Sequence, residues 1–87
     1  MNVELSKRML DDLRNNYVSF EYILREILPS VGDISKREIP PMFIDDDKEK
    51  VEISEEVIKE IRSIFPTEWK VEECCEYLLI LGVLMEV

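Results

Sequence analysis

The sequence predicts a small, mainly α-helical single domain over residues 1–87, with about three helices and room for a short two-stranded β pair. Apolar residues recur at spacings of three and four over long stretches, which is the pattern of amphipathic helices. Chain breakers are few, with four prolines and two glycines, and most lie between these stretches. A chain of 87 residues that is 46% hydrophobic can bury one core but not two.

The first stretch predicts one helix over residues 3–28. Its apolar residues follow helical spacing from Met9 to Ile27, and Pro29 ends the pattern. Asn15 and Asn16 are poor residues for a helix interior and mark the place where a break would fall. A single long helix remains the preferred interpretation.

Residues 29–54 form the predicted connector. A Pro-Pro pair imposes an extended turn on it, and a charged run follows at residues 45–50. Connections this long in a small domain usually pack on it or carry a function. We therefore expect Met42, Phe43 and Ile44 to dock on the core.

Residues 55–87 predict a hairpin-like pair of helices. Ser54 is the expected N-cap of a helix over residues 55–65, which Pro66 ends. Thr67 is the expected N-cap of a helix over residues 68–81.

Gly82 is the expected end of this last helix, because glycine readily adopts the positive φ of a helix C-terminus. Residues 83–87 then predict a short strand that pairs with residues 51–53. The helical stripes together define the expected core: Leu13, Tyr17, Leu24, Ile27, Ile58, Ile61, Phe65, Val71, Cys75, Leu78 and Leu81.

The capped helix, the stretch from Thr67 to Leu81 and the following Leu-Gly-Val-Leu resemble the final helix and first wing strand of winged-helix domains. The resemblance covers only the C-terminal part of the chain. A related fold is expected to serve protein contact in preference to base readout, and a DNA-binding regulator is the less favoured alternative. The sequence departs from that pattern where a recognition helix needs basic residues. The equivalent segment has one lysine, Lys70, against four carboxylates: Glu68, Glu72, Glu73 and Glu76.

The formal net charge of −9 is concentrated in the C-terminal half of the chain. Residues 51–87 carry three basic groups (Lys59, Arg62 and Lys70) against nine acidic ones, a net of −6. Nucleic acids and anionic membranes are bound largely through clustered Lys and Arg. This half is therefore expected to bind neither, and it favours a basic surface on another protein.

Enzyme chemistry has few candidates in the sequence. The chain has no histidine and no glycine-rich phosphate loop, and its serines have no evident activating partner. Cys74 and Cys75 are adjacent on a helix and point in different directions, and two thiols without histidine do not complete a zinc site. We interpret both as small core residues. No catalytic or cofactor-binding residue is predicted, and no cofactor is expected.

The acidic connector also invites a calcium interpretation. Asp45, Asp47, Glu49 and Glu56 occupy positions 1, 3, 5 and 12 of an EF-hand count, but Lys50 stands where the loop requires glycine. A solvated loop is the preferred interpretation and no metal site is predicted. Weak binding of a hard cation by residues 45–47 stays open.

The function that these observations favour is that of a non-catalytic protein-interaction module, an accessory subunit or adaptor of a larger complex such as a replication or transcription assembly. The expected partner is a protein with a basic or apolar docking surface, and a second copy of the chain is another candidate. The expected location is the cytoplasm, since the start of the chain does not resemble a signal peptide. The candidate interface residues are Tyr17, Phe20, Tyr22, Met42, Phe43, Trp69, Glu72, Glu73 and Glu76.

Three alternatives stay open at this point. Trp69 is either an interface anchor or, as we prefer, a hydrophobic cover over the junction between two helices. The acidic surface could instead belong to an inhibitor, such as a viral one, that imitates the phosphates of a nucleic acid. The winged-helix resemblance leaves a DNA-binding regulator as a third option. The absence of alanine and glutamine suits an AT-rich genome or a thermophilic source such as an archaeon.

Overall fold

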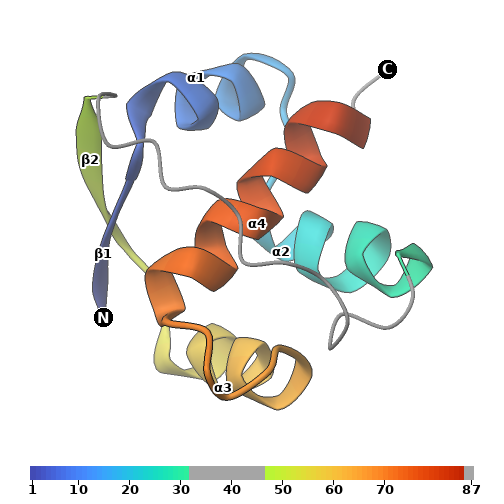
Figure 1. The fold of residues 1–87 in the computed structure, drawn as a ribbon. Coiled ribbons are helices and arrows are strands. Elements are labelled where there is room, and N and C mark those ends of the chain that lie inside the picture. The colour runs from blue at the N-terminus through green and yellow to red at the C-terminus, as the bar shows by residue number, and fades with distance from the viewer. Residues whose placement is uncertain (32–46, 86–87) are drawn as a thin grey trace.

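The computed structural model describes residues 1–31 and 47–85. Helix α4 runs through the middle, with the other helices around it and a β ribbon along one side (Figure 1). This arrangement confirms the predicted mainly α-helical domain with a two-stranded β pair. In chain order the elements are β1 (Asn2–Ser6), α1 (Lys7–Asn15), α2 (Phe20–Tyr22), a π-helical turn η1 (Ile23–Ile27), a 3-10 turn η2 (Leu28–Ser30), β2 (Lys48–Glu52), α3 (Glu55–Ile64) and α4 (Val71–Met85).

The chain begins with strand β1, so the predicted helix over residues 3–28 is wrong at its start. Val3 and Leu5 are buried while Glu4 between them is exposed, which is the alternation of a half-buried strand. β1 pairs with β2 in antiparallel register, with Val3 opposite Val51. The Ser6 hydroxyl then accepts a hydrogen bond from the Met9 backbone N–H at 3.5 Å and caps α1.

The predicted long helix is also broken after Asn15. Tyr17 has φ of 58°, in the left-handed region that side-chain-bearing residues seldom adopt. The Val18 N–H donates to the Leu13 carbonyl at 2.9 Å, which closes the turn. The Asn16 side chain donates to the Asp12 carbonyl at 2.9 Å and satisfies the end of α1. The break therefore falls at the asparagine pair that marked the weak point of the helical pattern.

Helix α3 agrees with the predicted helix over residues 55–65 to within one residue. Ser54 is its N-cap, since its hydroxyl accepts from the Val57 N–H at 3.3 Å. The strand predicted at residues 51–53 overlaps β2, but its partner is β1 and not residues 83–87.

Helix α4 starts later and ends later than predicted. The Lys70 N–H donates to the Glu73 carboxylate at 2.8 Å, which is the reciprocal half of a capping box, so Lys70 and not Thr67 begins the helix. Residues 83–85 are helical, and the predicted terminal strand is therefore wrong over these residues; residues 86–87 lie outside the described part. Without a strand at residues 83–85, the resemblance to a first wing strand fails there.

Gly82 lies inside α4 for a steric reason and does not end the helix. A Cβ at this position would lie 2.5 Å from Ile23 Cδ1 and 2.9 Å from Leu13 Cδ2. The missing side chain therefore allows α4 to approach α1 and η1 closely.

The core lies between α4 and the elements around it. Most of the predicted core is confirmed as buried: Leu13, Leu24, Ile58, Ile61, Phe65, Val71, Cys75 and Leu78. Ile27 and Leu81 are partly buried against it. Tyr17 is the wrong prediction, because it lies in the turn after α1 and is 96% exposed. The core residues that the prediction omitted include Val3, Leu5, Leu10, Ile23, Leu28, Ile53, Val57, Trp69, Cys74 and Leu79.

Candidate protein-docking surface

The nine candidate interface residues lie in different environments. Tyr17 and Tyr22 are exposed, whereas Phe20 packs partly against the core. Trp69 and Glu76 are buried and so do not belong to the surface. Glu72 and Glu73 are half-buried on α4, and Met42 and Phe43 lie outside the described residues.

The C-terminal part of helix α4 is apolar on its outer side as well as its inner side. Leu78 and Leu79 are fully buried, but Leu84, one turn or so beyond them, is 73% exposed. Val83 is only partly buried. A helix that is apolar all round is normally covered on every side. The C-terminal end of α4 therefore leaves apolar surface in contact with water.

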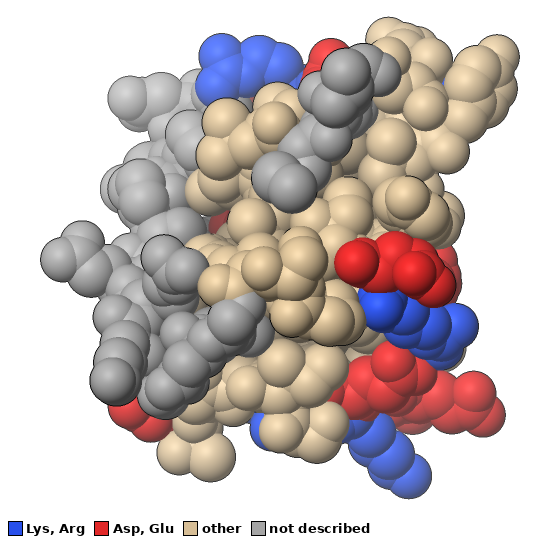
Figure 2. All heavy atoms as spheres, turned by 90° about the vertical axis from the view of Figure 1, so that its right-hand side faces the viewer, with Lys and Arg blue, Asp and Glu red and all other residues tan. Residues whose placement is uncertain are grey.

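This exposed end of α4 lies at the same end of the molecule as the turn that carries Tyr17 (Figure 1). Asn15 and Val83 line one groove, which places the end of α1 beside the end of α4. We define the docking surface as Tyr17, Val83 and Leu84. The face drawn in Figure 2 has an uncharged centre, with charged residues at its top, bottom and lower right.

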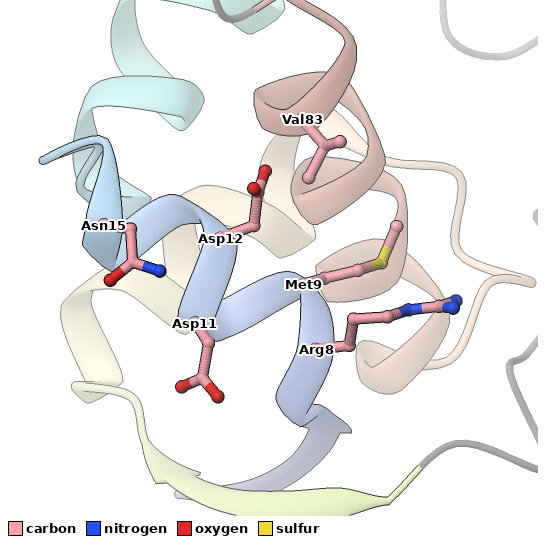
Figure 3. Close-up of a pocket in the computed structure, with 6 residues that line it drawn as sticks. All are labelled: Arg8, Met9, Asp11, Asp12, Asn15 and Val83. Atoms are coloured by element: carbon pink, nitrogen blue, oxygen red, sulfur yellow. The ribbon is translucent and has the colours of Figure 1, made fainter.

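The groove beside the docking surface runs between α1 and α4 and has a volume of about 530 Å³. Met9 and Val83 provide its apolar part. In Figure 3 the Asp12 side chain points from α1 toward Val83, while Asp11 points away from α4. The described residues that line it are Arg8, Met9, Asp11, Asp12, Asn15 and Val83.

Trp69 covers the junction between α3 and α4, as the preferred interpretation of this residue predicted. Its ring lies 5.5 Å from that of Phe65 and 5.6 Å from that of Tyr77, centroid to centroid. The Arg62 guanidinium donates to the Trp69 carbonyl at 3.0 Å. These contacts hold the turn between the helices and leave Trp69 only 3% exposed.

Glu76 is the least expected residue of the interior. Its side chain is fully buried, and Lys48 Nζ on β2 lies 3.6 Å from Oε1. Neither carboxylate oxygen has a hydrogen-bond partner. In sequence Glu76 lies near the half-buried Glu72 and Glu73 of α4, and no local pattern indicates that its side chain is fully buried and paired with Lys48 of β2.

Several surface carboxylates form ion pairs with arginines. Arg14 donates to Glu49 Oε1 at 3.0 Å and to Asp11 at 3.3 Å, and Arg25 donates to Glu60 at 2.8 Å. The hydrogen bond from Arg14 lowers the pKa of Glu49. The hydrogen bond from Arg25 does the same for the pKa of Glu60. Because these pairs are exposed, each contributes little to stability, but they remove carboxylates from the free acidic surface.

The calcium interpretation can be examined for part of the connector only. Asp45 lies outside the described residues, Glu49 is bound by Arg14, and Glu56 lies in the first turn of α3. Among the described residues no group of three or more Cys, Asp or Glu is arranged to hold a metal ion.

Cys74 and Cys75 are free thiols in the core, as predicted. Burial away from water raises the pKa of Cys74 to about 11 and that of Cys75 to about 12. Raised pKa values of this kind disfavour a reactive thiolate at neutral pH.

The two thiols predict a loss of stability at high pH. In the unfolded chain each thiol ionises near 9.0, whereas in the fold it stays neutral to about 11 or 12. The stability that the two neutral thiols contribute is therefore fully present below the pKa of the unfolded chain. It is lost as the pH rises through the pKa values of the folded protein. Urea unfolding followed by Trp69 fluorescence should show this decline, and Cys74→Ala/Cys75→Ala should show less of it. An equal decline in both proteins would contradict the assignment.

No family model, curated protein or solved structure matches the chain. No helix in the described ranges has both the length and the apolar character needed to cross a membrane.

Proposed function

We propose that this protein is a non-catalytic docking module, an accessory subunit or adaptor that binds a larger protein through the α1–α4 end. The exposure of Leu84 and Tyr17 at that end, 73% and 96% respectively, is the main observation in support. Fully burying a leucine contributes about 1.5–3 kcal/mol, so a partner that covers Leu84 gains a large part of its binding energy there.

The conformation of Tyr17 supports a binding role. A left-handed backbone at a bulky residue costs of order 1–3 kcal/mol and persists only where the surrounding structure imposes it. Here the strained backbone places the aromatic ring of Tyr17 in water, where it makes no contribution to the core. Tyrosine is among the residues enriched at interface hot spots.

The charge of the chain indicates the chemistry of the partner. With a net charge of −9, two copies of the chain repel each other, whereas a basic protein is attracted. An apolar surface ringed by basic residues complements the docking surface and the acidic groups around it. Replication and transcription proteins have basic surfaces of this kind. We therefore propose, more specifically, that the larger complex is a replication or transcription assembly.

The alternative of a nucleic-acid mimic fits the described surface less well. Mimicry needs a row of free carboxylates at phosphate-like spacing. Glu76 is buried, Glu73 caps α4, and Glu49 and Glu60 are bound by arginines. Tyr17 and Leu84, by contrast, offer exposed apolar area, and a protein partner can bury such area where a nucleic-acid site cannot.

Affinity capture from cells of the source organism tests the proposal. The bait proteins are the wild type, the docking variant Tyr17→Asn/Leu84→Ser and the control Ile64→Ser, which removes an exposed apolar side chain from α3. Asparagine tolerates the left-handed conformation, so the turn is preserved. We expect a stoichiometric partner with the wild type and the control. With the purified partner, the docking variant should bind at least tenfold more weakly, as for loss of about 2 kcal/mol at a hot spot.

Three results would contradict the proposal: no stoichiometric partner, equal binding by the docking variant, or turnover of a substrate by the purified protein. A partner that is released by competing DNA or RNA would instead favour the nucleic-acid mimic. Circular dichroism of all three baits controls for misfolding.

A further inference from the structure

We propose that the groove between α1 and α4 receives an arginine side chain of the protein partner. This inference rests on the proposed function and specifies which chemical group the partner presents beside the docking surface. The groove is open, has a volume of about 530 Å³ and includes Val83, the neighbour of the exposed Leu84. Val83 belongs both to the docking surface and to the groove, so a partner that covers the docking surface also reaches the groove.

The apolar part of the groove suits the stem of an arginine. Met9 of α1 and Val83 of α4 line it, and both pack partly against the core. Long basic side chains lay their methylene groups along apolar surface of this kind while the charged head reaches a polar rim. Methionine also adapts its shape to an incoming group.

The charges at the rim leave one carboxylate available. Asp11 is bound by Arg14 at 3.3 Å, and Arg8 makes an interaction of its own. Asp12 is half-buried and makes no ion pair with any other described residue. Its side chain points across the groove toward Val83 (Figure 3). The groove therefore combines an apolar wall with an unpaired carboxylate, and a cation with an apolar stem matches both.

Arginine matches this carboxylate better than lysine does. A guanidinium presents two parallel N–H donors to the two oxygens of a carboxylate, and it is less strongly hydrated than an ammonium group. At a half-buried aspartate both properties favour the guanidinium.

Titration of the ¹⁵N-labelled protein with two capped tripeptides tests the inference. The probes are acetyl-Leu-Arg-Leu-amide and acetyl-Leu-citrulline-Leu-amide, whose central side chains have nearly the same shape but differ in charge. We expect the arginine peptide to shift the amide signals of Met9, Asp12 and Val83 and to bind about tenfold more tightly than the citrulline peptide, because a charge-assisted hydrogen bond is lost with citrulline. Asp12→Asn should lower the affinity for the arginine peptide to that for the citrulline peptide. Asp11→Asn should leave the affinity for the arginine peptide within about twofold of the wild-type value.

Equal affinity of the two peptides, equal effects of the two variants, shifts away from the groove, or no saturable shifts would each overturn the inference. The titration needs no identified partner, so its failure can be distinguished from failure of the proposed function. A captured partner that depends on Leu84, with no arginine preference in the groove, would sustain the docking function and reject the arginine site.

Discussion

Replacing Gly82 by valine is expected to destabilise the fold by about 3 kcal/mol, at the upper end of the range for an overpacked core. A Cβ alone would lie 2.5 Å from Ile23 Cδ1, and Ile23 is fully buried. Leu13, the other neighbour, is only 4% exposed, so neither side chain has free space to move into. Urea unfolding followed by the fluorescence of the single tryptophan measures the change.

A double-mutant cycle identifies the contact responsible. Gly82→Ala improves helix propensity by about 1 kcal/mol, so net destabilisation by this substitution already indicates a steric conflict. Ile23→Val removes the Cδ1 atom that the new Cβ would meet. We expect Gly82→Ala to lower the free energy of unfolding by about 1 kcal/mol less in the Ile23→Val background than in the wild type. This difference is the coupling energy between the two positions. Leu84→Ala on the exposed side is the control, with a change within about 0.5 kcal/mol. A neutral Gly82→Val would contradict the close approach of α4.

Replacing Lys48 by methionine is expected to destabilise the fold by about 3 kcal/mol, because it leaves the Glu76 carboxylate buried without a counterion. Glu76 is fully buried, and Lys48 Nζ at 3.6 Å is its one ion-pair partner among the described residues. Neither Glu76 carboxylate oxygen accepts a hydrogen bond that could stabilise it once the Lys48 ammonium group is removed. Chemical unfolding at neutral pH measures the effect.

The two partners should differ in the cost of their removal. Lys48 Nζ is itself buried without a hydrogen-bond partner, but its side chain is 24% exposed, so in Glu76→Leu the flexible stem can carry the ammonium group to water. We therefore expect Glu76→Leu to cost less than Lys48→Met. The double variant Lys48→Met/Glu76→Leu should recover most of the stability, since an apolar pair can replace a buried ion pair without loss. If Lys48→Met alone is neutral, the Lys48–Glu76 ion pair does not stabilise the fold.

The parts of the fold that could be predicted are those where a local signal and the tertiary packing agree. Ser54, two acidic residues in the first turn and a regular apolar stripe define α3, and its prediction was correct to one residue. β1 could not be predicted as easily, because Val3 and Leu5 also extend the helical stripe that follows. Only pairing with β2, more than forty residues away, distinguishes strand from helix there.

Gly82 shows why the end of the last helix was missed. In sequence, glycine after an apolar helix indicates a C-terminus. In the structure the same residue relieves a steric conflict with Ile23 and Leu13, and the helix continues. Side-chain crowding between distant elements has no local signature, so the pattern alone favoured the wrong explanation.

The candidate site could be predicted in part. The surplus of apolar residues and the placement of Tyr17 and Tyr22 among the interface candidates identified exposed aromatic residues. Leu84 was missed because the predicted strand assigned it to a β pair. Glu76 was included as a surface charge because it shares a helix with Glu72 and Glu73, and its burial depends on Lys48 of β2.

Site-specific photocrosslinking tests the central claim that the α1–α4 end docks a protein. The photoreactive residue benzoylphenylalanine replaces Tyr17, Leu84 or, as the control on α3, Ile64, and each purified protein is irradiated in extract of the source cells. We predict that positions 17 and 84 crosslink to the same protein in high yield and that position 64 does not. Equal crosslinking at all three positions, or none at positions 17 and 84, would contradict the account.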